Sequence, residues 1–156
     1  MAIHKILIDD LLSSDYELIA IHSNLEDYRL AYLINKILGI KLSKNDFDVE
    51  LKSKEGKTIF GHFLFEDEMQ DLCWHLVSNK SNFISKNSNI GLFDNINATM
   101  SLIPEFKTAD YILKIDNTDD YFDPEIILKK LNEITNVSLV YKIEQNKLKS
   151  KNNLIF

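Results

Sequence analysis

The sequence predicts an α+β fold in which two helices pack on one face of a largely antiparallel sheet. Two passages, 16–51 and 109–143, each follow the pattern strand, helix, strand, and stretches with hairpin spacing lie between them. Capping signals mark where each helix is expected to begin. This order is typical of ferredoxin-like and ACT-like sandwiches, here with extra strands, and the comparison of folds implies no function.

The length and composition favour one domain with one core. The chain has 156 residues, of which 45% are hydrophobic and 27% charged, as in ordinary globular proteins. Four glycines and two prolines leave no candidate for a long flexible linker. We expect a single α+β domain over 1–146, followed by a basic tail over 147–156 that ends in apolar residues.

The first part of the chain is predicted to form two strands and a helix. The strands are expected over 3–8 and 16–22, which are mostly apolar. Ser23 and Glu26 stand at the spacing of a capping box, which predicts a helix over 24–38. The expected buried stripe and the helix-ending glycine are Leu30, Leu33, Ile34, Ile37 and Gly39.

The middle of the chain is predicted to consist of strands and one long loop. Residues 47–51 and 59–65 alternate apolar and polar side chains, which indicates an antiparallel hairpin. A further strand is expected over 69–77, with Leu72, Trp74 and Leu76 on one face, and a short helix is the alternative there. The stretch 78–98 is rich in Ser, Asn and Lys and is predicted to be a surface loop.

The last part repeats the strand and helix pattern. Strands are expected over 99–103 and 109–115, the second with Tyr111, Leu113 and Ile115 on one face. Asp123 is followed by proline and glutamate, a combination typical of the start of a helix. A final strand is expected over 137–143.

Composition also limits the location and the ligands. No apolar run approaches the roughly 18 residues of a membrane span, and no secretory leader precedes the first strand, so we expect a cytoplasmic protein. The net charge of −6 opposes binding to naked nucleic acid. Cys73, the single cysteine, has no disulfide partner and no zinc-site spacing around it, so we expect no metal and no cofactor.

The charges are unevenly distributed, which hints at a surface for a partner. Acidic residues gather in the middle of the chain and lysines near its end: Glu66, Asp67, Glu68 and Asp71, against Lys142, Lys147, Lys149 and Lys151.

One stretch resembles a known signature. Residues 103–111 are similar to the signature of the bacterial IPExxxVDY family, with Ala109 where that pattern has valine. The matching residues are Ile103, Pro104, Glu105, Asp110 and Tyr111. Segments 25–33 and 148–156 also resemble that family. The resemblance implies a bacterial cytoplasmic protein, and it brings with it no activity, ligand or catalytic residue.

Two groups of side chains are candidates for chemistry. Glu105 and Asp110 would serve as general acid and base if they faced one cavity, whereas the alternative is that they stabilise a turn and the start of a strand. His62 and His75, near Glu66 and Asp71, would supply ligands for a divalent metal if their strands were neighbours. They lack any zinc-binding spacing, however, and alternation along their strands predicts that both histidines point outward to solvent. No nucleotide-binding or serine-hydrolase motif is present.

The C-terminal tail is a candidate docking segment, because lysines precede an apolar end in an acidic chain. The residues concerned are Lys147, Lys149, Lys151, Leu154, Ile155 and Phe156. The alternative is that the apolar side chains fold back on their own domain.

The absence of catalytic motifs, together with the charge asymmetry, favours a non-catalytic binding or adaptor module. We expect it to form a homo-oligomer or to join a larger protein assembly. One alternative is an ACT-like sensor of a small molecule, and another is an enzyme that uses Glu105 and Asp110.

Overall fold

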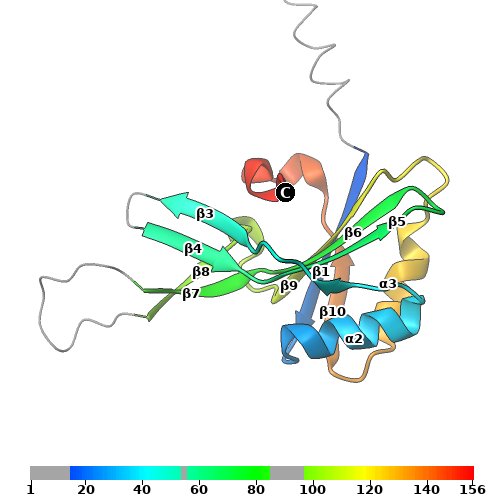
Figure 1. The fold of residues 1–156 in the computed structure, drawn as a ribbon, viewed down its shortest axis with the longest axis horizontal. Coiled ribbons are helices and arrows are strands. Elements are labelled where there is room, and N and C mark those ends of the chain that lie inside the picture. The colour runs from blue at the N-terminus through cyan, green and yellow to red at the C-terminus, as the bar shows by residue number, and fades with distance from the viewer. Residues whose placement is uncertain (1–14, 54–55, 85–96) are drawn as a thin grey trace, which may run out of the picture.

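The structure is built on one six-stranded sheet that is covered on both faces (Figure 1). The computed structural model describes residues 15–53, 56–84 and 97–156. In spatial order the strands are Val137–Lys142 (β10), Tyr16–Ser23 (β1), Tyr111–Asp116 (β9), Leu72–Ser78 (β6), His62–Asp67 (β5) and Ser43–Lys44 (β2). All neighbouring strands pair antiparallel. The helices α2 (Asp27–Leu38) and α3 (Pro124–Asn132) cover one face, so the predicted α+β class is confirmed.

The topology consists of two interlocked split β-α-β units. β1 and β6 both pair antiparallel with β9, so they run parallel to each other, and α2 lies in the passage between them. In the same way β9 and β10 flank β1, and α3 connects them. This order is that of a ferredoxin-like sandwich, to which β5 and β2 are added at one edge.

The first helix ends as predicted but begins later. Gly39 adopts a left-handed conformation with φ 68°, and its N–H donates to the carbonyl of Asn35. The predicted capping box is wrong, because Ser23 is the last residue of β1 and its hydroxyl donates to the carbonyl of Asn136 at 2.8 Å. Glu26 takes the cap position without a side-chain hydrogen bond.

The second helix begins as predicted. Oδ1 of Asp123 accepts a hydrogen bond from the backbone N–H of Glu125 at 3.0 Å, and Pro124 is the first helical residue. Neither helix, among the described residues, is long and apolar enough to cross a membrane.

Two hairpins extend from the sheet (Figure 1). Val49–Ser53 (β3) pairs with Gly56–Phe60 (β4), so a hairpin forms here as predicted, but its second strand ends at residue 60 and does not extend over 59–65. The chain then passes through Gly61 into β5. A side chain at this residue would meet the carboxylate of Asp27 at 3.0 Å, so glycine allows the two segments to approach closely. The expected 59–65 strand is therefore two strands in different sheets.

The second hairpin corrects the predicted 78–98 loop. Lys80–Ile84 (β7) pairs with Asn97–Ser101 (β8), so strand replaces loop at both ends of that stretch. The remainder of it, and the strand expected over 3–8, lie outside the described residues.

The face under the helices carries what we call the helix-side core. It contains the predicted apolar faces of β6 and β9, including Trp74 at 4% exposure. Leu33 and Ile37 of the predicted helical stripe are partly buried against it. Its buried members are Ile19, Ile21, Leu30, Ala31, Ile34, Leu42, Phe63, Leu72, Trp74, Leu76, Tyr111, Leu113, Ile115, Leu131, Ile134, Val137 and Val140.

The opposite face carries a second cluster, the tail-side core. Two 3-10 helices, Gln145–Lys147 (η2) and Lys151–Leu154 (η3), lie over it, together with the turn Pro104–Phe106 (η1). Its buried members are Tyr16, Leu18, Ala20, Val49, Phe60, Val77, Leu102, Ile103, Ala109, Ile112, Ile143, Leu148 and Leu154. The expectation of one core is therefore replaced by two cores separated by the sheet.

Candidate functional site

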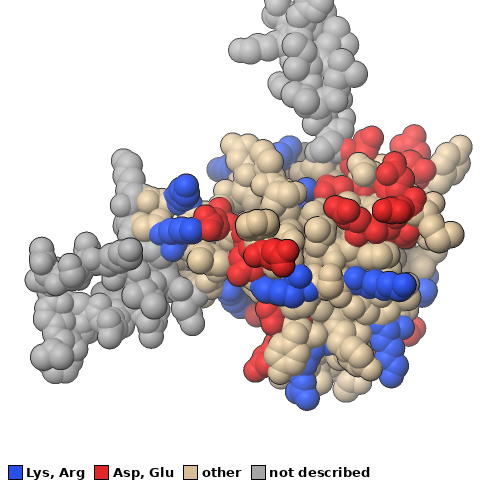
Figure 2. All heavy atoms as spheres, in the orientation of Figure 1, with Lys and Arg blue, Asp and Glu red and all other residues tan. Residues whose placement is uncertain are grey.

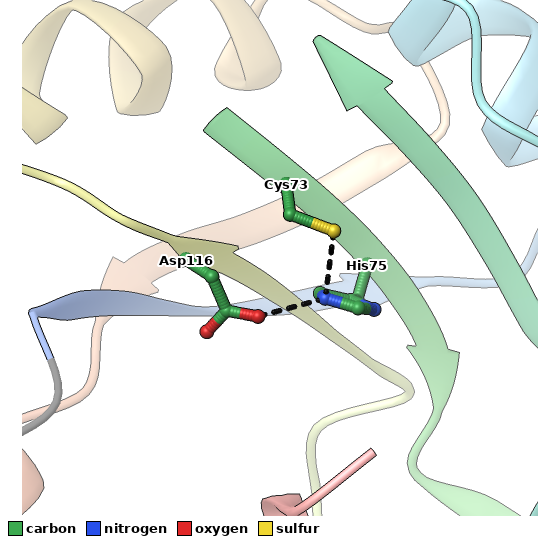
Figure 3. A group of neighbouring side chains, drawn as sticks. All are labelled: Cys73, His75 and Asp116. Carbon is green, nitrogen blue, oxygen red and sulfur yellow. Dashed lines mark hydrogen bonds and ion pairs between the residues drawn. The ribbon is translucent and has the colours of Figure 1, made fainter. Parts of the chain in front are cut away.

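Three side chains of different chemistry meet on the tail-side face of the sheet (Figure 3). Cys73 and His75 are two residues apart on β6 and so point to the same face, and Asp116 pairs with Cys73 from β9. Nε2 of His75 lies 2.8 Å from Oδ2 of Asp116 and 3.3 Å from Sγ of Cys73. The three ligand atoms lie within 4.8 Å of one another. We call this group the Cys-His-Asp cluster.

A relay of hydrogen bonds leads into the cluster from the neighbouring strand. Nδ2 of Asn45 lies 3.1 Å from Nδ1 of His62, and Nε2 of His62 lies 3.0 Å from Nδ1 of His75. An amide nitrogen donates and an ionised carboxylate accepts, so the two ends fix the direction of the relay. Each imidazole thus accepts through Nδ1 and donates through Nε2, and the last proton points to Asp116.

Charge and burial set the protonation of the cluster. Burial opposes ionisation of Asp116, but hydrogen bonds from His75 and Lys114 outweigh it and lower the pKa of that carboxyl. Burial lowers the pKa of His62 to about 4, so this imidazole is neutral at pH 7 and can serve in the relay. Burial also raises the pKa of the Cys73 thiol, and the charge of Asp116 adds to the effect. Cys73 is therefore not an activated nucleophile, since the thiolate is the reactive form.

The end of the chain partly covers this site. The ring of Phe156 packs edge-on against His62 and His75, with centroid separations of 5.2 and 5.1 Å. Nζ of Lys114 lies 4.9 Å from the centroid of the same ring and 3.0 Å from Oδ1 of Asp116. Cys73 and Asp116 keep intermediate exposure, so the cluster is reachable from one side.

The prediction that both histidines face solvent is wrong. His62 is 3% and His75 4% exposed, because the tail covers the face to which alternation directs them. The sequence around Cys73 showed no metal-binding spacing, but in the fold His75 and Asp116 lie beside its thiol. One signal was present, since residues 73 and 75 lie on one face of any strand. Asp116 joins them only through the pairing of β9 with β6, which sequence spacing does not reveal.

Glu105 of the signature motif holds the C-terminal tail. Its carboxylate accepts hydrogen bonds from the backbone N–H groups of Lys149 and Ser150, both at 3.0 Å, and from the Ser150 hydroxyl at 2.6 Å. Burial opposes ionisation of Glu105, but these hydrogen bonds outweigh it and lower the pKa of the carboxyl. Two segments that are 44 residues apart in sequence are joined here.

The rest of the motif joins the strands to the first helix. Oδ2 of Asp110 accepts the N–H of Ser23, and Oδ1 pairs with Lys80 at 2.9 Å. The Tyr111 hydroxyl donates to the carbonyl of Leu25 at 2.6 Å, and burial raises the pKa of Tyr111 to about 12. Ile103 is fully buried in the tail-side core, and Pro104 opens η1.

The two carboxylates considered for catalysis bind different partners. Asp110 lines a polar pocket of about 460 Å³ whose other lining residues are Ser23, Asn24, Thr135, Asn136 and Ser138. Glu105 and the histidines are not among that pocket's lining residues. The enzyme hypothesis would need both carboxylates in one cavity, and nothing in these contacts supports it.

The tail residues divide into buried and exposed groups. Leu154 is 2% exposed in the tail-side core, and Phe156 packs against it, as in the alternative in which the tail folds back. Ile155 is 80% exposed. The tail lysines are exposed too: Lys147, which pairs with Glu144 at 2.9 Å, Lys149 and Lys151.

Among the described residues, β10 is the longer of the two edge strands of the main sheet. β10 has six residues, whereas β2 at the opposite edge has two, and no described strand pairs with its outer side. Leu139 on β10 is 49% exposed. At the start of this strand, Asn136 lines a further pocket together with Tyr28 and Tyr32 of α2. Both tyrosines are among the exposed large apolar side chains.

Comparison with known proteins adds no relative: no family model matches the chain, and no curated protein matches it. The resemblance to the IPExxxVDY signature thus stays a prediction.

Proposed function

We propose that this chain is a non-catalytic binding module of a cytoplasmic protein assembly, and that its first partner is a second copy of itself. The observation that carries the proposal is the open edge of β10, with the exposed side chain of Leu139 beside it. Unpaired backbone groups on a strand edge bind another strand by completing its hydrogen bonds.

A second copy suits this edge because antiparallel pairing of β10 with itself is self-complementary. A two-fold axis would place the same strand on both sides, which is how a closed dimer forms from one surface. Leu139 lies opposite His22 in the strand pairing and would meet apolar atoms of the other copy across the axis. The signature carboxylates are consistent with a non-catalytic role, since they bind backbone amides of the chain itself.

Light scattering after size exclusion, over a range of concentrations, tests this proposal. The parent protein should be a dimer, and Leu139→Lys should be a monomer, because a lysine on an edge opposes strand pairing. Met69→Lys is the matched control, since it places the same charge at a 97% exposed residue away from β10. A parent that stays monomeric at high concentration would overturn the proposal.

The exposed part of the tail is a further proposed contact of this module. Ile155 and the lysines at 147, 149 and 151 are accessible, whereas Leu154 is not. Neutralising the three lysines should weaken association and flatten its salt dependence, because their charges act mainly through steering. An unchanged salt dependence would exclude the tail from the interface.

The ACT-like sensor is a second candidate because a polar pocket adjoins the same edge. Asn136 and Ser138 line it at the start of β10, so a ligand there would lie beside the proposed dimer interface. A metabolite screen by thermal shift distinguishes the two functions. A compound that raises the melting temperature of the parent but not of Ser138→Ala would favour the sensor.

A further inference from the structure

We infer that the Cys-His-Asp cluster binds a divalent transition-metal cation of the zinc class. Cys73, His75 and Asp116 supply one sulfur, one imidazole nitrogen and one carboxylate oxygen from two paired strands. These are the three donor types that protein zinc sites use, and three protein ligands leave a fourth position for water or substrate. The inference is independent of self-association through β10.

The observed distances are close to those of such a site. Zinc bonds of about 2.0–2.3 Å in a tetrahedron place neighbouring ligand atoms roughly 3.3–3.6 Å apart. Sγ of Cys73 is 3.3 Å from Nε2 of His75, and Oδ2 of Asp116 is 2.8 Å from the same nitrogen. The third separation, between Sγ of Cys73 and the Asp116 carboxylate, is no more than 4.8 Å. To hold the cation, the carboxylate must move away from Nε2 of His75 and end about 3.5 Å from the sulfur.

The relay provides the outer hydrogen bond that a metal-bound histidine needs. A ligating imidazole donates its second N–H to an acceptor, which fixes the ring orientation. When Nε2 of His75 binds the cation, its proton moves to Nδ1 and the relay reverses, with His62 accepting through Nε2 and Asn45 turning its amide oxygen inward. The same three side chains satisfy both directions, so binding leaves no buried group without a partner.

The charges around the cluster also favour a cation. Acidic side chains gather at the end of the sheet where β5 turns into β6, next to Cys73 (Figure 2). Glu66 pairs with Cys73 across the two strands. The ammonium group of Lys114 pairs with Oδ1 of Asp116, so the other carboxylate oxygen, Oδ2, faces His75 and is available to the metal. The Cys73 thiol gives its proton to solvent as the sulfur binds the cation, so the bound ligands carry two negative charges.

Cobalt binding by the full chain tests the inference, because a thiolate ligand produces a charge-transfer band that carboxylate and imidazole ligands do not. The parent should bind one Co²⁺ with that band, and added Zn²⁺ should displace it. Cys73→Ala should abolish the band, and Asp116→Asn should weaken Zn²⁺ binding measured by calorimetry at least tenfold. His22→Gln is the matched control, since His22 lies on β1 and bonds to Tyr141 outside the cluster.

A variant of the relay provides a second readout. His62→Leu removes no ligand but takes away the acceptor for Nδ1 of His75, so it should weaken Zn²⁺ binding by roughly 10–100-fold, as loss of an outer hydrogen bond does. Circular dichroism of each variant checks that it is folded. A parent without the cobalt band, or a band that persists in Cys73→Ala, would overturn the inference and leave the cluster as a hydrogen-bonded network of the tail-side face.

Discussion

The two faces of the central sheet are stabilised by different means. The helix-side core is covered by α2 and α3, whose apolar stripes come from continuous, regular segments. The tail-side core is covered by short 3-10 turns of the C-terminal segment, which Glu105 holds in place through Lys149 and Ser150. One strand serves both faces, since β6 directs Trp74 to the helices and His75 to the tail. The helix-side core is built from regular elements, whereas the tail-side face carries the Cys-His-Asp cluster.

The largest effect is expected on the helix side. Ile34→Ala removes a fully buried side chain of α2 and should lower the free energy of unfolding by about 2–5 kcal/mol, through lost burial and the cavity that remains. Denaturant unfolding measures the change. Tyr32→Ala, on the exposed side of the same helix, is the control and should change stability little. Equal losses in both variants would contradict the packing of α2.

A smaller and more local effect is expected on the tail side. Leu154→Ala should cost about 2 kcal/mol, at the low end for a buried leucine, because the short η3 turn can adjust around the gap. Hydrogen exchange should be faster at the backbone amide of Asn153, which donates to the carbonyl of Ser150 in this turn, with little change in α2. Ile155→Ser should leave both measurements unchanged. A global loss as large as that of Ile34→Ala would show that the two faces unfold as one.

A third prediction concerns the carboxylate that holds the tail. Glu105→Gln should cost about 1 kcal/mol, less than a buried charged hydrogen bond, because the carboxylate is exposed to water. The folded pKa of Glu105 is lowered, so its contribution is fully present above the unfolded value of about 4.3 and is lost as the pH falls through the folded pKa. Unfolding at several pH values should show a shallower acid loss in the variant than in the parent. Identical slopes would mean that Glu105 does not hold the tail.

The smallest effect is expected at the Asp123 cap of α3, a single side-chain hydrogen bond to a backbone amide on the helix side. Asp123→Ala removes one hydrogen bond to the first turn of α3 and should cost roughly 0.5–1 kcal/mol. Asp123→Asn is the control, because asparagine caps a helix about as well as aspartate does. If the asparagine variant loses as much as the alanine variant, charge rather than the hydrogen bond is responsible.

The sequence predicted the helix-side face better than the tail-side face. Periodicity located α2, α3, β6 and β9, because a regular element with one buried side repeats its apolar residues at a fixed interval. Ser23 misled the prediction because its hydroxyl bonds to Asn136, a partner 113 residues away. The burial of His62 has a similar origin, since no local pattern shows that a distant tail will cover an outward-facing position.

The candidate site was hidden for the same reason. Two of its side chains, Cys73 and His75, lie on one strand, but Asp116 comes from β9, and its position beside them is fixed by strand register. The sequence offered, as the alternative to catalysis, that Glu105 stabilises a turn by satisfying loop amides, and its carboxylate does accept backbone amides. The sequence did not indicate that these amides belong to Lys149 and Ser150 in the C-terminal tail.

The position of Trp74 gives the protein an internal optical reporter. It is the single tryptophan of the chain, buried beside Phe122 at a ring separation of 6.5 Å, and its indole N–H has no hydrogen-bond partner among the described residues. Its emission should therefore lie to the blue and respond to water entering beneath the helices. Cys73 and His75 lie directly before and after Trp74 on β6, and their side chains are on the opposite face of the sheet. A cation bound to them would therefore shift the backbone of Trp74 without contacting its indole ring. Fluorescence thus records, from inside the molecule, whether an event on one side of the sheet is transmitted to the other.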